Sequence, residues 1–241
     1  MVGERIVNSV GRGASVIASS SVVLLMLCVC GEGNAVATPA QAKNSVPTSE
    51  WGGAVNASHA KKKYGNVFGL GMGMSVDALQ NELSFKAEKG MYVGLPPEPS
   101  DLFNKYGVVA TRKSGACSVT AMTSDIEIND PGTQIKRQVD EIAEVLKVKY
   151  GVPTRKVDFI REGGGADDPS YWSMHLEHES VSYGYVWTSG ENGLTLPNDL
   201  DSIAVTAVGL SMHTARANLQ YNFKNAKSCE EDIRIEKSSK L

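Results

Sequence analysis

The chain has 241 residues, of which 41% are hydrophobic and 21% charged, a composition that supports a folded core. Its 27 acidic and 24 basic residues give a formal net charge of −3 at pH 7. This balance lacks the broad positive field that phosphate backbones require, so we expect no nucleic-acid partner. The local basic run at residues 61–63 is interpreted as a solvated stretch before the first strand rather than as an anion patch.

The N-terminal residues have the layout of a secretory signal. Two arginines precede an apolar run over residues 14–30, and polar residues follow it. Two small-x-small sites then end at Ala37 and Ala42, and we expect cleavage after Ala37 because it lies closer to the apolar run. The alternative is a retained anchor helix, since about 17 apolar or small residues approach the lower limit for spanning a bilayer.

Cleavage gives the chain three parts. Residues 1–37 form the predicted signal peptide, and residues 38–63 are predicted to be a flexible tether because they are polar and lack periodicity. Residues 64–241 are expected to fold as a single domain. The mature protein would then be periplasmic or secreted, without a stable membrane span, whereas an uncleaved N-terminal helix would anchor it to the membrane.

Four cysteines bear on the compartment. Removal of the signal takes Cys28 and Cys30 away and leaves only Cys117 and Cys229. An even number in an oxidising compartment predicts one disulfide between them. A crosslink that closes a loop of about 110 residues contributes about 4 to 5 kcal/mol in the chain-entropy estimate. The alternative is a pair of buried free thiols, as in a cytosolic protein.

The folded part is predicted to begin with a strand over residues 67–72. A short helix follows, with Ser75 as its N-cap and Val76, Leu79 and Leu83 on one face. Three alternating glycines in this stretch do not have the spacing of a dinucleotide or phosphate loop, so we expect no nucleotide site.

Three further strands are predicted before the main helix. A short strand covers residues 91–93, and two longer strands flank a turn at Ser114 and Gly115. The second long strand alternates two faces, and Ile126 and Ile128 continue with the alternation of a half-exposed strand.

One long helix is the strongest prediction in the chain. Ile135, Val139, Ile142 and Leu146 recur at spacings of four, three and four, which makes a single apolar stripe. Gly151 ends the pattern, and a proline two residues later prevents continuation. We expect this helix to cover one face of an antiparallel sheet.

The C-terminal third is predicted to contain two hairpins. Residues 170–179 and 180–189 alternate apolar and polar side chains, with a turn near Glu179 and Ser180. A second hairpin turns at His213 and Thr214, and a short terminal helix or strand carries Cys229. Together these elements predict an α+β fold with an antiparallel β-sheet packed against one long and one short α-helix, and a single disulfide.

Aromatic residues of the first predicted hairpin are the candidate binding surface, because Tyr and Trp are enriched at protein interfaces and sugar-facing surfaces. They are Tyr171, Trp172, Tyr183, Tyr185 and Trp187. Core packing under the long helix accounts for most of these rings and leaves about one for the surface. Asp167 and Asp168, in the preceding glycine-rich loop, are candidate contact residues, although the loop lacks the spacing of a calcium site.

A metal site is considered at His175, Glu177 and Glu179, which alternate along the strand predicted at residues 170–179. Zinc sites gather three or four ligands from more than one element, and the sequence offers no second cluster. We therefore expect no metal, no cofactor and no catalytic residue motif, and we interpret these residues as a solvent-facing strand.

Export, a stapled scaffold and aromatic hairpins favour a cell-envelope binding protein without catalytic activity and with a protein partner. An inhibitor or protective partner of a secreted enzyme is one form of this hypothesis. The alternative is an envelope hydrolase or carbohydrate-active enzyme that uses dispersed carboxylates such as Glu177 or Asp167, and a third is a purely structural envelope component.

Overall fold

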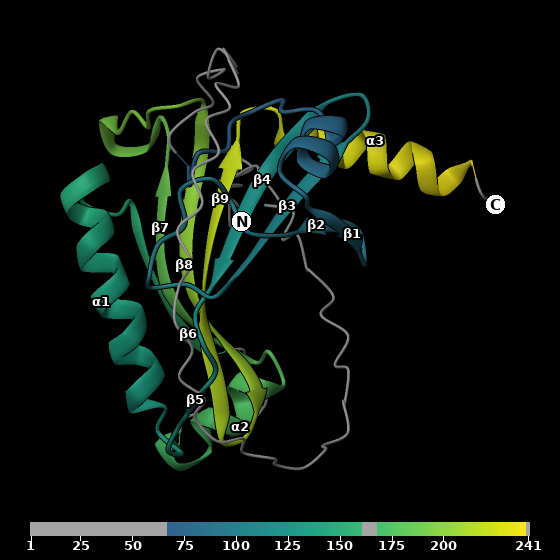
Figure 1. Ribbon diagram of the computed structural model, residues 1–241. Helices are drawn as coiled ribbons and strands as arrows, with labels where there is room; N and C mark the ends of the chain where they lie inside the picture. Colours follow the sequence, from purple (N-terminus) through teal and green to yellow (C-terminus); the bar gives the residue numbers. More distant parts are fainter. Residues whose placement is uncertain (1–66, 161–167, 240–241) are drawn as a thin grey trace, which may run out of the picture. The chain divides into compact units, whose positions relative to one another are not determined.

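The computed structural model describes residues 67–160 and 168–239 (Figure 1). The predicted signal peptide over residues 1–37, the tether over residues 38–63 and Asp167 lie outside the described residues. No helix within the described ranges has the length and apolar character needed to cross a membrane.

A nine-stranded antiparallel sheet carries the fold. Eight strands follow the order β1-β2-β3-β4-β9-β8-β7-β6, and β5 pairs with β9 outside this path. The strands are β1 (Lys86–Glu88), β2 (Met91–Val93), β3 (Lys105–Thr111), β4 (Gly115–Met122), β5 (Ile126–Glu127), β6 (Arg155–Ile160), β7 (Val181–Thr188), β8 (Leu200–Ser211) and β9 (Thr214–Phe223).

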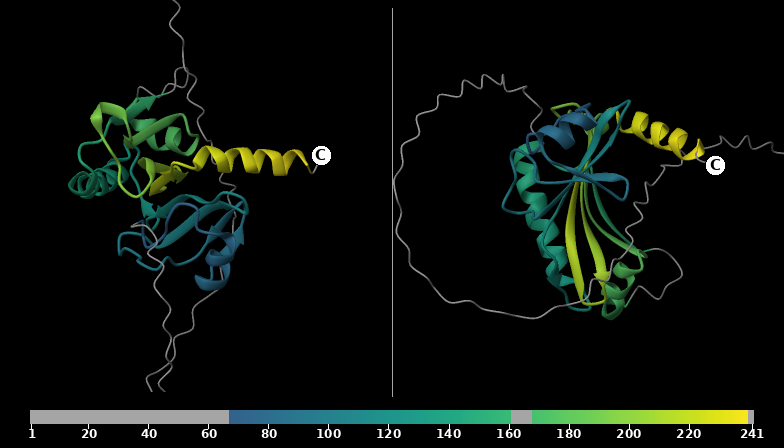
Figure 2. Two further views of the ribbon diagram at one scale, coloured as in Figure 1. Left: turned by 90° about the horizontal axis from the view of Figure 1, so that it is seen from above. Right: turned by 45° about the vertical axis from the view of Figure 1, so that its right-hand side comes forward.

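Within residues 67–160 and 168–239, three α-helices and three short helical turns accompany the sheet. They are η1 (Ala78–Glu82, a π turn), α1 (Thr133–Tyr150), η2 (Pro169–Tyr171), α2 (Trp172–Glu177), η3 (Glu191–Gly193) and α3 (Ala226–Ser238). Figures 1 and 2 show α1 and α3 on opposite sides of the sheet. This placement divides the sheet into an inner face under α1 and an outer face.

The predicted apolar stripe of α1 is confirmed and forms the centre of the core. Ile135, Val139, Ile142 and Leu146 are all buried, and the helix packs across β7, β8 and β9. The inner face of the sheet contributes branched and aromatic side chains to the same core, so water is excluded between the helix and the sheet. The helix ends at Gly151, whose φ of 84° suits a residue without a Cβ.

Several other predictions are confirmed. The α+β class holds, Cys117 and Cys229 are joined in a disulfide, and the hairpin at His213 and Thr214 joins β8 to β9. The predicted strand at residues 91–93 is β2, and the two longer strands are β3 and β4. Ser75 is the predicted cap, because its Oγ accepts a hydrogen bond from the Ala78 N–H at 3.1 Å.

The prediction of a strand over residues 170–179 is wrong. The segment forms η2 and α2, and β7 pairs with β6 and β8 instead of with a hairpin partner. Trp172 and Leu176 are four residues apart, so the same alternation that suggested a strand also places both on one helix face. The absence of a side chain at Gly209 in β8 leaves room for α2, since a Cβ there would lie 2.6 Å from the Glu177 backbone nitrogen.

The prediction of a strand over residues 67–72 is also wrong. Val67 and Leu70 form an isolated bridge around a tight turn in which Phe68 and Gly69 have φ values of 55° and 77°. Pro97 packs against Gly69 so closely that a Cβ there would lie 2.8 Å from the proline Cβ. The glycine therefore serves the turn and the close approach of the following loop.

Gly209→Ala tests the close packing of α2 on β8. The added methyl group would meet the helix backbone, so we expect the free energy of unfolding to fall by about 1 to 3 kcal/mol, measured by urea denaturation. Val208→Ala, one residue away and on the outer face, is the matched comparison and should cost less. An equal or smaller loss for Gly209→Ala would contradict the position of α2.

Candidate functional site

A polar cluster lies between α1 and the end of the sheet formed by β7 and β6. Oδ1 of Asp140 on α1 accepts hydrogen bonds from the hydroxyls of Tyr183 and Tyr185, each at 2.8 Å. The two tyrosines are two residues apart on β7, so both side chains face inward toward the helix. One carboxylate oxygen therefore fixes two phenol rings.

Lysine side chains lie over these rings. The Lys136 Nζ is 4.0 Å from the ring centroid of Trp172, and the Lys156 Nζ is 4.9 Å from that of Tyr183. Lys147 and Lys156 approach the Tyr185 ring, at 5.7 and 5.8 Å. These distances fall within the range of cation–π attraction. We call Lys136, Asp140, Lys147, Lys156, Asp158, Trp172, Tyr183 and Tyr185 the tyrosine–lysine cluster.

Burial and hydrogen bonding set the protonation of the cluster. Burial, then the hydrogen bond to Asp140, raises the pKa of Tyr183 far above its ordinary value, and the same causes raise the pKa of Tyr185. Both phenols therefore remain hydrogen-bond donors. Burial lowers the pKa of Lys136, an effect that the charge of Asp158 opposes.

The structure brings part of the predicted aromatic surface together. Trp172, Tyr183 and Tyr185 share the cluster, and Tyr185 is the half-buried ring among them. Trp187 is fully buried, and its Nε1 donates a hydrogen bond to the Gly151 carbonyl at 2.7 Å. Tyr171 is 52% exposed and contributes no ring contact in the described structure. Their role in binding stays a prediction.

Of the two predicted aspartates, only Asp168 can be placed. Its Oδ1 accepts a hydrogen bond from the Ser170 N–H at 2.9 Å, which lowers its pKa and secures the start of η2. Asp168 is exposed, and its neighbour Asp167 lies outside the described residues. The observed contact gives Asp168 a capping role, while any contact with a partner stays a prediction.

The side chains considered for a metal site do not share a strand face. His175 is buried in α2, and its Nδ1 lies 3.0 Å from the Ser180 Oγ. Glu177 ends the helix, and Glu179 follows it with a φ of 55°. Within the ranges that the structure covers, His, Cys, Asp and Glu form no group of three or more that could hold a metal ion.

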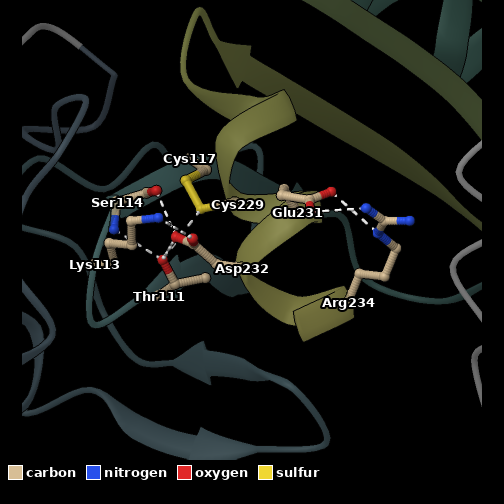
Figure 3. A network of polar contacts seen from close by, with 8 residues as sticks. All are labelled: Thr111, Lys113, Ser114, Cys117, Cys229, Glu231, Asp232 and Arg234. Atoms are coloured by element: carbon tan, nitrogen blue, oxygen red, sulfur yellow. Dashed lines mark hydrogen bonds and ion pairs between the residues drawn. A yellow bond between two sulfur atoms is a disulfide. The ribbon is translucent and has the colours of Figure 1, made fainter. Parts of the chain in front are cut away.

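A second polar network anchors α3 to the β3–β4 hairpin (Figure 3). The Asp232 carboxylate accepts hydrogen bonds from Ser114 Oγ at 2.6 Å and from Thr111 Oγ1 at 2.8 Å. The Lys113 Nζ approaches the same carboxylate at 3.4 Å, and the disulfide joins Cys229 to the hairpin one turn earlier. A covalent and a polar contact therefore hold the first half of α3.

Asn225 strengthens this anchor at the start of α3. Its Nδ2 donates hydrogen bonds to the carbonyls of Ser114 and Ala116, at 3.0 and 3.1 Å. Beyond Asp232 the side chains from Arg234 onward are exposed, and Arg234 pairs with Glu231 on the helix itself. The network in Figure 3 thus has a structural role at the helix root.

The sequence alone pointed to the tyrosines but not to Asp140 or the lysines around them. Lys136 and Asp140 are four residues apart on one flank of α1, and Lys147 extends the same flank two turns later. A polar flank of this kind also occurs on ordinary exposed helices, so the spacing could not identify its aromatic partners.

Comparison of the chain with known protein families, with curated proteins and with solved structures finds no match in any of the three.

Asp140→Ala tests the shared carboxylate. Removing it leaves the buried Tyr183 hydroxyl and the half-buried Tyr185 hydroxyl without their acceptor, so we expect a loss of about 1 to 3 kcal/mol in urea unfolding. Glu141→Ala removes a neighbouring exposed carboxylate, paired with Arg137 at 3.8 Å, and should change stability by about 0.5 kcal/mol or less. Equal effects of the two substitutions would contradict the arrangement.

The pKa of Asp232 predicts an acid-dependent anchor. Hydrogen bonds from Ser114 and Thr111, aided by the charge of Lys113, lower this pKa in the folded protein. The stabilisation is therefore present above the unfolded-state pKa and is lost as pH falls through the folded-state pKa. We expect Asp232→Asn to flatten the fall of the melting temperature below about pH 4, measured by calorimetry. Asp201→Asn, at an exposed site, is the control and should keep the wild-type dependence of the melting temperature on pH. A wild-type dependence in Asp232→Asn as well would contradict the prediction.

Proposed function

We propose that the protein is an exported cell-envelope protein that binds a protein partner and does not catalyse a reaction. The disulfide between Cys117 and Cys229 supports an oxidising compartment, where such a crosslink persists. The charged, apolar and polar order of residues 1–37 supports export by a cleaved signal. An inhibitor or protective partner of a secreted enzyme remains the form of this function that we favour.

The observation that carries this proposal is the tyrosine–lysine cluster. Tyr185 presents a half-buried ring whose hydroxyl Asp140 already holds, so binding would immobilise little additional side chain. Rigid aromatic rings bordered by charged side chains have the composition of binding hot spots. The helix and the strand fix the positions of both.

Charge indicates the chemistry of the partner. Lys147 and Lys156 flank the Tyr185 ring; Lys147 is paired with Glu144 on α1, and the Lys156 side chain is 49% exposed. Its ion pair with Asp158 spans 3.6 Å between half-exposed groups and is therefore weak. A partner that places carboxylates around an apolar contact for Tyr185 would complement this surface.

The alternative of an envelope hydrolase with Glu177 or Asp167 has no comparable support. Glu177 is half-buried at the end of α2, and among the described residues it belongs to no group of three or more His, Cys, Asp and Glu side chains that could hold a metal ion. Asp167 lies outside the described residues. This alternative becomes an outcome of the test rather than a second proposal.

Capture from envelope extract tests the proposed function. Immobilised wild-type protein should retain one partner in a stoichiometric amount, and the purified partner should bind Tyr185→Ala or Lys156→Glu at least tenfold more weakly in calorimetry. Lys227→Glu places the same charge change on exposed α3 and serves as the control. Undiminished binding by both cluster variants would contradict the proposal, as would turnover of an envelope substrate that Glu177→Gln abolishes.

A further inference from the structure

The outer face of the sheet is formed by side chains that point away from α1. Tyr185 and Trp187 of β7 pair with Val205 and Ile203 of β8 on the inner face, so the alternate positions point outward. Both α1 and α2 pack on the inner side, where Trp172 and Leu176 join the core. On the outer side α3 contacts β3 and β4, away from β7 and β8 (Figure 2).

Strand register gives the outer side chains of β4, β9, β8 and β7 a regular arrangement. In that strand order the three rows are Ser118, Asn222, Ser202 and Thr188; Thr120, Gln220, Ala204 and Val186; and Met122, Asn218, Thr206 and Gly184. We call these twelve residues the open face. Its β4 side chains are buried, whereas those of β9 and β8 are half-buried.

The open face contains no charged residue. With 21% of the whole chain charged, about two or three of twelve positions would carry charge by chance, and exposed sheet surfaces are usually richer still. Charge begins only at the rim. Arg216 pairs there with Asp125 at 3.4 Å, and Arg155 occupies the outer position of β6 beside Val186.

Amide and hydroxyl groups fill the centre of the open face. Gln220 Nε2 donates to Asn222 Oδ1 at 2.9 Å, and Asn222 Nδ2 donates to Ser202 Oγ at 3.1 Å. Asn218 Oδ1 is buried and has no hydrogen-bond partner among the described residues. The face therefore offers donors and acceptors side by side, together with one acceptor whose hydrogen bond is unmade.

An aromatic ring stands at the rim of the same face. Phe159 of β6 pairs with Ser182, whose side chain also points outward, and the phenylalanine is 50% exposed. With Val157 and Val186 it supplies an apolar surface next to the amide and hydroxyl groups. A polar array beside an exposed ring suits a ligand that has both hydroxyl edges and apolar ring faces.

We infer that the open face binds a neutral glycan strand. A charged ligand would find no opposite charge within the twelve positions, and an apolar ligand would leave the Asn218 Oδ1 without a hydrogen bond. Sugar hydroxyls donate and accept as these amides do, and a pyranose face can pack on Phe159. This ligand would lie on the face opposite the tyrosine–lysine cluster, so loss of either function leaves the other measurable.

A folded protein is a weaker match to this surface. Protein surfaces carry about a quarter to a third charged residues, and these would be desolvated here without partners. Half-buried hydroxyls and amides instead favour a ligand whose own polar groups are uncharged. The neutral glycan is therefore the occupant for which the open face is best suited.

Titration of the purified exported chain with cellohexaose, N-acetylated chitohexaose and heparin tests this inference by calorimetry. We expect saturable binding of at least one neutral hexasaccharide. Its affinity should change little between about 50 and about 500 mM salt, a range over which screening strongly weakens interactions between charges. Gln220→Leu should weaken that binding at least tenfold, equivalent to about 1.4 kcal/mol.

Two further variants keep the test decisive. Gln80→Leu makes the same change at an exposed site on η1 and should bind as the wild type does. Thr206→Val removes one hydroxyl with almost no change in volume, and it replaces Gln220→Leu if circular dichroism shows that variant to be unfolded. The inference is overturned if neither neutral hexasaccharide binds, if heparin binds more tightly, or if the open-face variants bind as tightly as Gln80→Leu.

Discussion

Burial of the α1 stripe against the inner face of the sheet is the contact on which the remaining structure depends. Ile135, Val139 and Leu146 cover β7, β8 and β9, and their burial excludes water from the inner face of the sheet. The same docking brings Asp140 to the tyrosines of β7. It also leaves the opposite side of these strands without a helical cover in the described part of the chain, so both candidate surfaces follow from one packing event.

Local sequence patterns predicted the elements whose signals lie within a few residues. The α1 stripe repeats over three turns, and the turn at His213 joins two strands that each alternate regularly. The strand prediction for the segment from Trp172 to Glu177 was wrong because apolar residues four apart fit both the strand period and the helix period. The contact with Gly209, which favours the helix, comes from a strand distant in the sequence. The sequence pattern did not predict the strand β6, because charged side chains interrupt its apolar residues. Such charges on an edge strand protect it from pairing with another chain.

The sequence predicted only part of each candidate surface, for a related reason. Alternation along β7 identified Tyr183 and Tyr185 as one face, but their acceptor Asp140 lies 43 and 45 residues away. Likewise, Gln220 and Asn222 could be assigned to one side of a strand, whereas their neighbours in β4 and β8 depend on non-local register. Side-chain composition fixes what a strand can present, and strand pairing decides which groups meet.

The most direct measurement of this two-sided sheet is hydroxyl-radical footprinting of the folded protein, read by mass spectrometry at individual side chains. Phe159 points to the outer side and is 50% exposed, whereas Phe223 points to the inner side and is fully buried. Because both are phenylalanines, their intrinsic reactivity is the same and only solvent access differs. Rapid oxidation of Phe159 with protection of Phe223 is expected, and comparable oxidation of the two rings would contradict a sheet that α1 covers on one side.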